Sequence, residues 1–190
     1  MAEIKAIISD FDGTLVDTYE ANYRAYQQAF ASIGYDLKRE TYRACFGLRY
    51  DKLIERLGLE QKEGIRKVQE LKAKYYPHYF EYLRVNKVLV EFIRSFHAGG
   101  GKTAIASTAR RENLMAALKF IGAEGLFDII LAGDVVEHGK PNPEIYQKAL
   151  DMLQVAAEET ICFEDTEVGI EAAKAAGISV ITIDGNYYGN

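Results

Sequence analysis

The strongest constraint on the fold of this chain is an alternation of short apolar runs with helical patterns. Five runs, at residues 4–9, 103–107, 128–132, 160–163 and 179–183, are apolar enough to be buried strands. A single helical pattern lies between each successive pair of the last four runs. Strands of this kind, joined through helices, are typical of a parallel sheet with helices on both faces. We therefore predict an α/β fold with a Rossmann-like sheet and right-handed crossovers.

Residues 17–85 interrupt this pattern and differ in composition. They hold 10 of the 13 tyrosines but 4 of the 16 glycines, and their net charge of +3 contrasts with −8 for the rest of the chain. Helices are predicted at 18–33, 51–57 and 60–83. Pro77 should break the last of them. We expect an inserted, all-helical block at residues 17–85, and a core formed by residues 1–16 and 86–190.

The overall composition excludes several classes of protein. The chain is 48% hydrophobic and 27% charged, which is typical of a globular domain. Its net charge of −5 gives no reason to expect a nucleic-acid partner, and no run of about 20 apolar residues predicts a membrane span. The beginning of the sequence shows no signal-peptide pattern. We therefore expect a cytoplasmic monomer in which Cys45 and Cys162 are free thiols.

Polar residues gather where the predicted strands end. In open α/β sheets, ligands bind beyond the carboxyl ends of the strands. Each of these residues could merely cap a helix, but their occurrence after four successive strands favours a shared site. The residues in question are Asp10 and Asp12, Ser107 and Thr108, Lys140, and Glu164 with Asp165.

The first of these groups belongs to the pattern Asp10-Phe11-Asp12-Gly13-Thr14, which is rare by chance. Together with Ser107, with Lys140 in the run 139–143, and with Glu164 and Asp165 in the run 163–169, it resembles the haloacid dehalogenase superfamily. The branch in question carries a helical cap inserted just after the first strand. The residues around Lys140 and Glu164 are most similar to the β-phosphoglucomutase-like and phosphoglycolate-phosphatase-like group.

The resemblance implies phosphoryl transfer through an aspartyl-phosphate, with Asp10 as the nucleophile and Asp12 as the general acid and base. A carboxylate that attacks a phosphate is repelled by roughly 4 kcal/mol for each charge pair at about 4 Å and an effective dielectric near 20. Mg²⁺ would offset this repulsion. Asp10, Glu164 and Asp165 offer the hard oxygen ligands that it prefers, and Asp12 would add its backbone carbonyl.

Other residues would bind the phosphate group and the substrate. Lys140 supplies a positive charge on the nucleophile and on the transferring group. Ser107 and Thr108, with the backbone N–H groups that open the following helix, would seat the phosphate. Arg49 matches a position where some relatives place a substrate-recognising arginine, although a surface arginine is an equally simple interpretation. The expected partner is a small phosphorylated metabolite.

Four alternatives to a Mg²⁺-dependent phosphatase remain. A sugar-phosphate mutase of the β-phosphoglucomutase type is disfavoured because Asn22 stands where such mutases commonly have a histidine. A dehalogenase would need neither the acid and base at Asp12 nor the metal site. A phosphoacceptor receiver domain has no inserted cap of this size. A non-catalytic binding module on this fold would not need the complete set of site residues. Mg²⁺-dependent release of phosphate would separate the catalytic from the non-catalytic interpretations.

Overall fold

The computed structural model describes residues 3–184, and this part of the chain divides into two compact units. The core unit comprises the residues up to Asp17 and those from Arg84 onward, and the helical unit is Thr18–Leu83. The outer ends of the predicted core domain, residues 1–2 and 185–190, lie outside the described residues.

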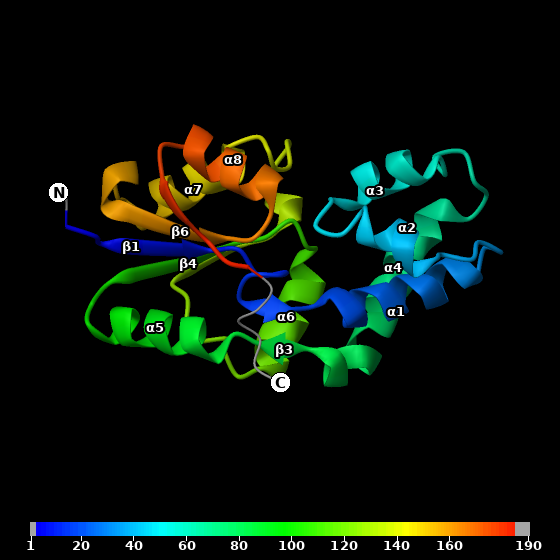
Figure 1. Cartoon of the computed structure of the whole chain (residues 1–190), viewed down its shortest axis with the longest axis horizontal. Coiled ribbons are helices and arrows are strands. Elements are labelled where there is room, and N and C mark those ends of the chain that lie inside the picture. Colours follow the sequence, from blue (N-terminus) through cyan, green and yellow to red (C-terminus); the bar gives the residue numbers. More distant parts are fainter. Residues whose placement is uncertain (1–2, 185–190) are drawn as a thin grey trace. The chain divides into compact units, whose positions relative to one another are not determined.

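The core unit is built on a five-stranded sheet in the order β5-β4-β1-β6-β7, and every neighbouring pair is parallel, as predicted (Figure 1). The central position of β1 puts the residue after it between two other strand ends, because Ser9 pairs with Ile105 on one side and with Phe163 on the other. The strands are β1 (Ala6–Ser9), β4 (Lys102–Ala106), β5 (Ile129–Leu131), β6 (Thr160–Glu164) and β7 (Ser179–Thr182).

Helices cover both faces of this sheet, with α7 and α8 on one face and α5 and α6 on the other (Figure 1). Alternate strand residues such as Ile8 and Ala104 pack with Tyr146 and Ala149 of α7 in one buried cluster. Two 3₁₀ turns, Gly133–Val135 and Ala157–Glu159, complete the connections. The helices are α5 (Lys87–Ala98), α6 (Arg111–Phe120), α7 (Glu144–Leu153) and α8 (Glu167–Ala175).

A short antiparallel ribbon joins the connections to the helical unit. Strand β2 (Val16–Asp17) pairs with β3 (Arg84–Val85), so the chain leaves and rejoins the core unit at adjacent positions. Sequence analysis placed Asp17, Arg84 and Val85 within the helical block. A strand of two residues shows no periodicity, and the ribbon could therefore not be recognised from the sequence.

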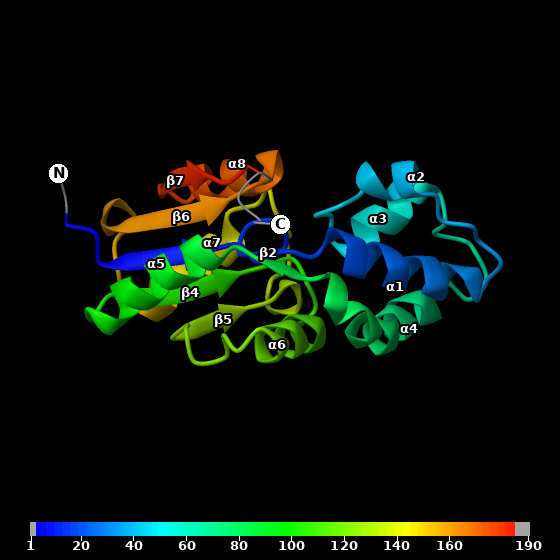
Figure 2. The same cartoon turned by 60° about the horizontal axis from the view of Figure 1, so that its bottom comes forward.

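The helical unit contains helices and no strand between Thr18 and Leu83, as predicted (Figure 2). The helix predicted over 60–83 is shorter, because a turn precedes Ile65 and the chain changes to a 3₁₀ helix beside Pro77. A packed cluster of aromatic and aliphatic side chains fills the centre of the helical unit. The elements are α1 (Tyr19–Ala31), α2 (Arg39–Arg43), α3 (Tyr50–Leu57), α4 (Ile65–Tyr75) and the 3₁₀ helix η1 (Tyr76–Tyr82).

Two simpler expectations can be compared with the structure. Cys45 and Cys162 are both buried and free, as predicted. Among residues 3–184, none of the helices combines the length and the apolar character that crossing a bilayer would require.

Candidate active site

A buried lysine lies between two buried carboxylates at the carboxyl end of the sheet. Asp10 directly follows β1, Glu164 is the last residue of β6, and Lys140 lies in the connection between β5 and α7. The Lys140 Nζ atom is 2.6 Å from Asp10 Oδ1 and 2.5 Å from Glu164 Oε1. The exposed fractions of the three side chains are 3% for Lys140, 9% for Asp10 and 0% for Glu164. The strand ends therefore bring together residues that lie far apart in the sequence.

Both oxygens of Glu164 accept hydrogen bonds. Oε1 accepts one from Lys140 and another from the hydroxyl of Tyr146, at 2.9 Å. Oε2 accepts the backbone N–H groups of Asp165 and Thr166, at 3.0 and 3.1 Å, and the Thr166 hydroxyl at 3.1 Å. This carboxylate is therefore fixed by Lys140, by Tyr146 on α7 and by the turn that opens α8.

Three carboxylates form a cluster that could hold a metal ion. One oxygen from each of Asp10, Glu164 and Asp165 lies within 4.8 Å of the others. The Thr14 hydroxyl donates to Asp165 Oδ1 at 2.8 Å and orients that side chain. A set of carboxylate oxygens suits a hard divalent cation such as Mg²⁺. Asp12 was assigned to the metal through its backbone carbonyl, and its carboxylate lies outside this cluster of described residues.

Two glycines leave room for these carboxylates. A Cβ atom at Gly169, inside α8, would lie 1.8 Å from Glu164 Oε1. At Gly13, where φ is +96°, a Cβ atom would lie 2.2 Å from Asp165 Oδ2. Side chains at either position would collide with the cluster, because real Cβ contacts of this length do not occur. In the sequence, a glycine in the interior of a predicted helix is the signal that another group packs closely against Gly169.

Burial and mutual repulsion shape the ionisation of the cluster. Burial raises the pKa of Asp10 well above its usual value and raises that of Asp165 to about 6. Burial also opposes the charge on Lys140, but Asp10 and Glu164 raise the pKa of its ammonium above the ordinary value. For Glu164, burial raises the pKa, but Lys140 and the hydrogen bonds from Thr166 and Tyr146 together outweigh burial and lower the pKa below its ordinary value. One cation among three carboxylates leaves excess negative charge, and a divalent cation would offset it.

A second group of predicted residues follows the ends of β1 and β4. The Ser107 hydroxyl donates to Asp12 Oδ2 at 3.2 Å and accepts the backbone N–H of Ala109 at 3.0 Å. Thr108 is next in the chain, and its carbonyl oxygen would lie 2.3 Å from a Cβ atom at Gly133. The structure thus brings Asp12 and Ser107 into contact at the strand ends, and Thr108 directly follows Ser107 in the chain.

Arg49 belongs to the helical unit and is the N-cap of α3. Its Nε and one terminal nitrogen donate to the two carboxylate oxygens of Asp51, at 2.7 and 3.0 Å. A phosphate group that bound Arg49 would compete with this pair.

Sequence analysis missed Tyr146. Its position on the apolar face of α7 is typical of a core residue, and nothing in the sequence points to the hydrogen bond between its hydroxyl and Glu164.

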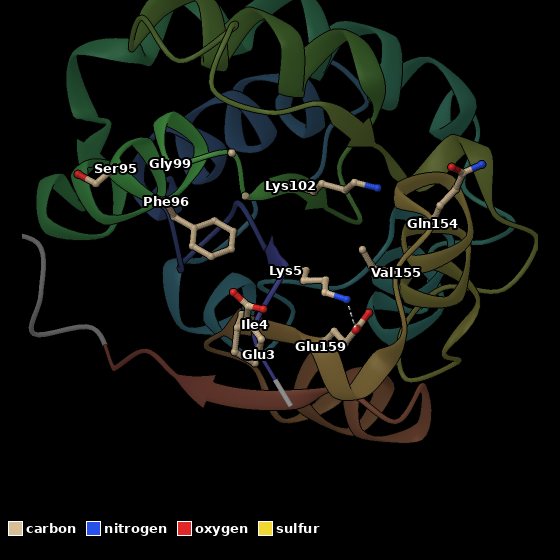
Figure 3. A pocket seen from close by; sticks show the side chains of 12 residues that line it. Glu3, Ile4, Lys5, Ser95, Phe96, Gly99, Lys102, Gln154, Val155 and Glu159 are labelled. Atoms are coloured by element: carbon tan, nitrogen blue, oxygen red, sulfur yellow. Dashed lines mark hydrogen bonds and ion pairs between the residues drawn. The ribbon is translucent and has the colours of Figure 1, made fainter. Parts of the chain in front are cut away.

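A separate cavity of about 470 Å³ lies at the opposite, amino end of the strands (Figure 3). Both of its lysines are paired with protein groups. Lys5 binds Glu159 at 2.5 Å, and Lys102 donates to the Leu153 carbonyl at 2.5 Å. The predicted site residues of the core unit follow the other ends of the strands, so this cavity is not the candidate active site.

The family model of the haloacid dehalogenase-like hydrolases matches residues 7–183. A phosphorylated carbohydrates phosphatase of Thermotoga maritima is 33% identical over 187 residues, covering 94% of this chain and 84% of that protein. Pyrophosphatase PpaX of Halalkalibacterium halodurans is 32% identical over 187 residues, covering 95% and 84%. The resemblance seen in the sequence motifs is confirmed over nearly the whole chain.

The fold is likewise similar to that of a solved structure. The crystal structure of a CbbY variant from Rhodobacter sphaeroides, in complex with xylulose-(1,5)bisphosphate, matches with a TM-score of 0.86 at 32% sequence identity. The match covers 97% of this chain and 88% of that chain. The predicted α/β architecture is therefore confirmed by a solved structure as well as by the strand order.

Proposed function

The chain belongs to the haloacid dehalogenase-like hydrolases, and we propose that it is a Mg²⁺-dependent phosphatase that hydrolyses a small phosphorylated metabolite. The observation that carries this proposal is the contact of the buried Lys140 with Asp10, inside a cluster of three carboxylates. A nucleophilic carboxylate, a fixed positive charge and a set of hard oxygen ligands are what attack on a phosphate monoester requires. Relatives whose names are those of phosphatases support the same conclusion.

In the proposed mechanism, a carboxylate oxygen of Asp10 attacks the phosphorus atom, and the bond from phosphorus to the leaving oxygen breaks. Asp12 gives its proton to that oxygen. It then takes a proton from the water that hydrolyses the aspartyl-phosphate, so inorganic phosphate leaves and Asp10 is restored. The contact between Asp12 and Ser107, at 3.2 Å, would hold the acid in place between the two steps.

The metal would be held by the carboxylates of Asp10, Glu164 and Asp165 with the backbone carbonyl of Asp12, and it would supply positive charge against the substrate phosphate. Lys140 would add a second positive charge beside the nucleophile. Ser107 and Thr108 would bind the phosphate oxygens near the start of α6.

We assign different roles to the two parts of the chain. Residues 1–16 and 86–190 would form the catalytic core, and residues 17–85 would act as a cap that selects the substrate. Arg49 is the candidate for substrate recognition within this cap. Its existing pair with Asp51 uses Nε and one terminal nitrogen, an edge of the guanidinium with which arginine can also bind two phosphate oxygens.

A phosphorylated carbohydrate is the favoured substrate, because relatives with this fold and over 30% identity include a phosphorylated carbohydrates phosphatase and an enzyme solved with a sugar bisphosphate. The test is phosphate release from a panel of sugar phosphates, nucleotides, phosphoglycolate and pyrophosphate, with Mg²⁺ or with a chelator. We expect release from at least one sugar phosphate with Mg²⁺ and none after chelation. Activity that is unaffected by a chelator would contradict the proposed metal site.

The same panel, run with and without glucose 1,6-bisphosphate, distinguishes hydrolysis from mutase chemistry. A phosphatase releases phosphate without this activator. A mutase would instead convert one sugar phosphate into its isomer and would depend on the bisphosphate.

A further inference from the structure

Tyr146 is a fully buried residue whose hydroxyl reaches into the site. Its exposed fraction is 0%, and its hydroxyl donates to Glu164 Oε1 at 2.9 Å. The same oxygen accepts the hydrogen bond from Lys140, whose Nζ atom is 5.1 Å from the centre of the Tyr146 ring. The ring of Tyr146 therefore packs near the Lys140 ammonium, and its hydroxyl binds Glu164, which also binds that ammonium.

We propose that Tyr146 is a positioning residue that acts through Glu164 to hold the Lys140 ammonium against Asp10. This inference rests on the proposed function, in which Lys140 stabilises the phosphate group that Asp10 attacks. Within residues 3–184, the hydroxyl of Tyr146 forms its hydrogen bond with Glu164 and none with Asp10, and burial raises the pKa of the phenol well above its usual value. Its contribution is thus to geometry, and Tyr146 is not itself a catalytic residue.

The need for such a residue follows from the flexibility of lysine. A lysine side chain has four rotatable carbon–carbon bonds and carries a point charge, so its position depends on its partners. Glu164 Oε2 is fixed by the turn at Asp165 and Thr166, while the donors to Oε1 among the described residues are Lys140 and Tyr146. Without the phenol, Oε1 and the ammonium can shift together and move away from Asp10.

A packing role alone makes a different prediction. The ring of Tyr146 lies in the apolar cluster with Ala149 and Leu153, and phenylalanine would fill the same space. Removal of the hydroxyl leaves no buried partner unpaired, because Glu164 Oε1 keeps Lys140 and the Cys162 thiol, which also interacts with the hydroxyl, keeps the Phe163 carbonyl. Tyr146→Phe should therefore fold, and it separates the two roles.

The kinetic test compares wild type and Tyr146→Phe on the best sugar phosphate of the panel, with Mg²⁺. We expect kcat to fall about tenfold, as for the loss of one hydrogen bond to a charged group, while KM changes less than about twofold. Tyr23→Phe is the matched control, because Tyr23 is also buried and donates a hydrogen bond, to the Leu37 carbonyl in the helical unit. We expect its kcat to equal that of wild type.

A double-mutant cycle tests the route of the effect. If Tyr146 acts through Lys140, Tyr146→Phe should cause almost no further loss of kcat in the Lys140→Ala background. An equal tenfold loss in both backgrounds would overturn the proposed route. An unchanged kcat in the single variant would overturn the proposal itself.

A measurement independent of activity is the NMR signal of the Lys140 side-chain ammonium, recorded without substrate or metal. In wild type we expect a protected signal, identified by its absence from Lys140→Ala, because the group is buried and hydrogen-bonded. Tyr146→Phe should broaden or shift it, whereas Tyr23→Phe should not. If wild type released no phosphate from any substrate, the proposed function would fail, and this signal would still test the positioning role. A signal identical in wild type and Tyr146→Phe would overturn the inference.

Discussion

Lys140 is the residue on which the charges of the site depend. It is the cation in direct contact with both Asp10 and Glu164, and all three side chains are almost completely buried. Buried carboxylates that lose their cationic partner are left without compensation, which costs more than the pair itself contributes. The same ammonium therefore has two measurable effects, one on stability and one on catalysis.

Lys140→Ala should lower the free energy of unfolding by about 3–5 kcal/mol near neutral pH in the absence of metal, and should lower kcat/KM about 10²- to 10³-fold. Urea unfolding and phosphate release measure the two effects. Arg94→Ala is the control, because its pair with Glu91 on α5 is exposed and contributes about 0–1 kcal/mol. If Lys140→Ala kept wild-type kcat/KM, Lys140 would have no role in the reaction.

Glu144 anchors the chain just before Lys140. Hydrogen bonds from Lys148 and from the backbone N–H groups of His138 and Glu137 lower its pKa from 4.5 to about 2. A carboxyl group whose pKa is depressed by folding stabilises the protein above its unfolded pKa and loses this effect as the pH falls toward the folded pKa. The stabilisation should thus be complete above pH 4.5 and should disappear between pH 4.5 and about 2.

Glu144→Gln tests this pH dependence. Wild type should have the higher Tm above pH 4.5, and the difference in Tm should shrink as the pH is lowered toward about 2. Calorimetry of both proteins across this range provides the measurement. A difference in Tm that stays constant with pH would show that the charge of Glu144 is not responsible.

At the scale of the elements, the sequence predicts most of the secondary structure. The buried strands and the core-unit helices show their periods clearly, and each begins or ends near its expected residue. Helix α2, with five residues, and the ribbon of β2 and β3 are too short to show a period. The turn at 60–64 was included in a helix because the long apolar pattern around it resembles one.

The site was predictable to the extent that strand ends were predictable. Asp10, Lys140, Glu164 and Asp165 all meet because parallel strands end at one edge of the sheet. Tyr146 could not be predicted, since a tyrosine on the apolar face of a helix has the same pattern whether or not its hydroxyl reaches a carboxylate. The roles of these residues in the reaction stay predictions until they are measured.

Gly169→Ala tests the close approach of α8 to the carboxylates. Alanine is the better helix former by about 1 kcal/mol, but its Cβ atom would lie 1.8 Å from Glu164 Oε1 and must displace that side chain. We expect kcat/KM to fall at least about tenfold through the shift of Glu164 and Lys140.

Gly58→Ala is the control for the Gly169 substitution. It strains the left-handed C-cap of α3 by about 1–2 kcal/mol, yet no atom lies within 4 Å of its Cβ position. Equal activity of Gly169→Ala and wild type would contradict the proposed crowding.

For the whole molecule, the two units differ in chemistry. Each has its own hydrophobic cluster, and adjacent connections at β2 and β3 join them. The excess of negative charge lies outside residues 17–85, in the part of the chain that carries the acidic cluster. The core unit therefore contains a complete candidate set of nucleophile, acid, cation and metal ligands, and the reaction should depend on it as a set.

The central claim is that Asp10 is the nucleophile, and the most direct measurement is mass spectrometry of the protein quenched in acid during turnover of a sugar phosphate with Mg²⁺. A phosphate adduct on the peptide that contains Asp10 is expected in wild type. Asp10→Asn should be folded by circular dichroism, carry no adduct and release no phosphate, because its amide removes the nucleophile with little change in volume. Steady phosphate release by folded Asp10→Asn, or a wild-type adduct on a different residue, would contradict the account.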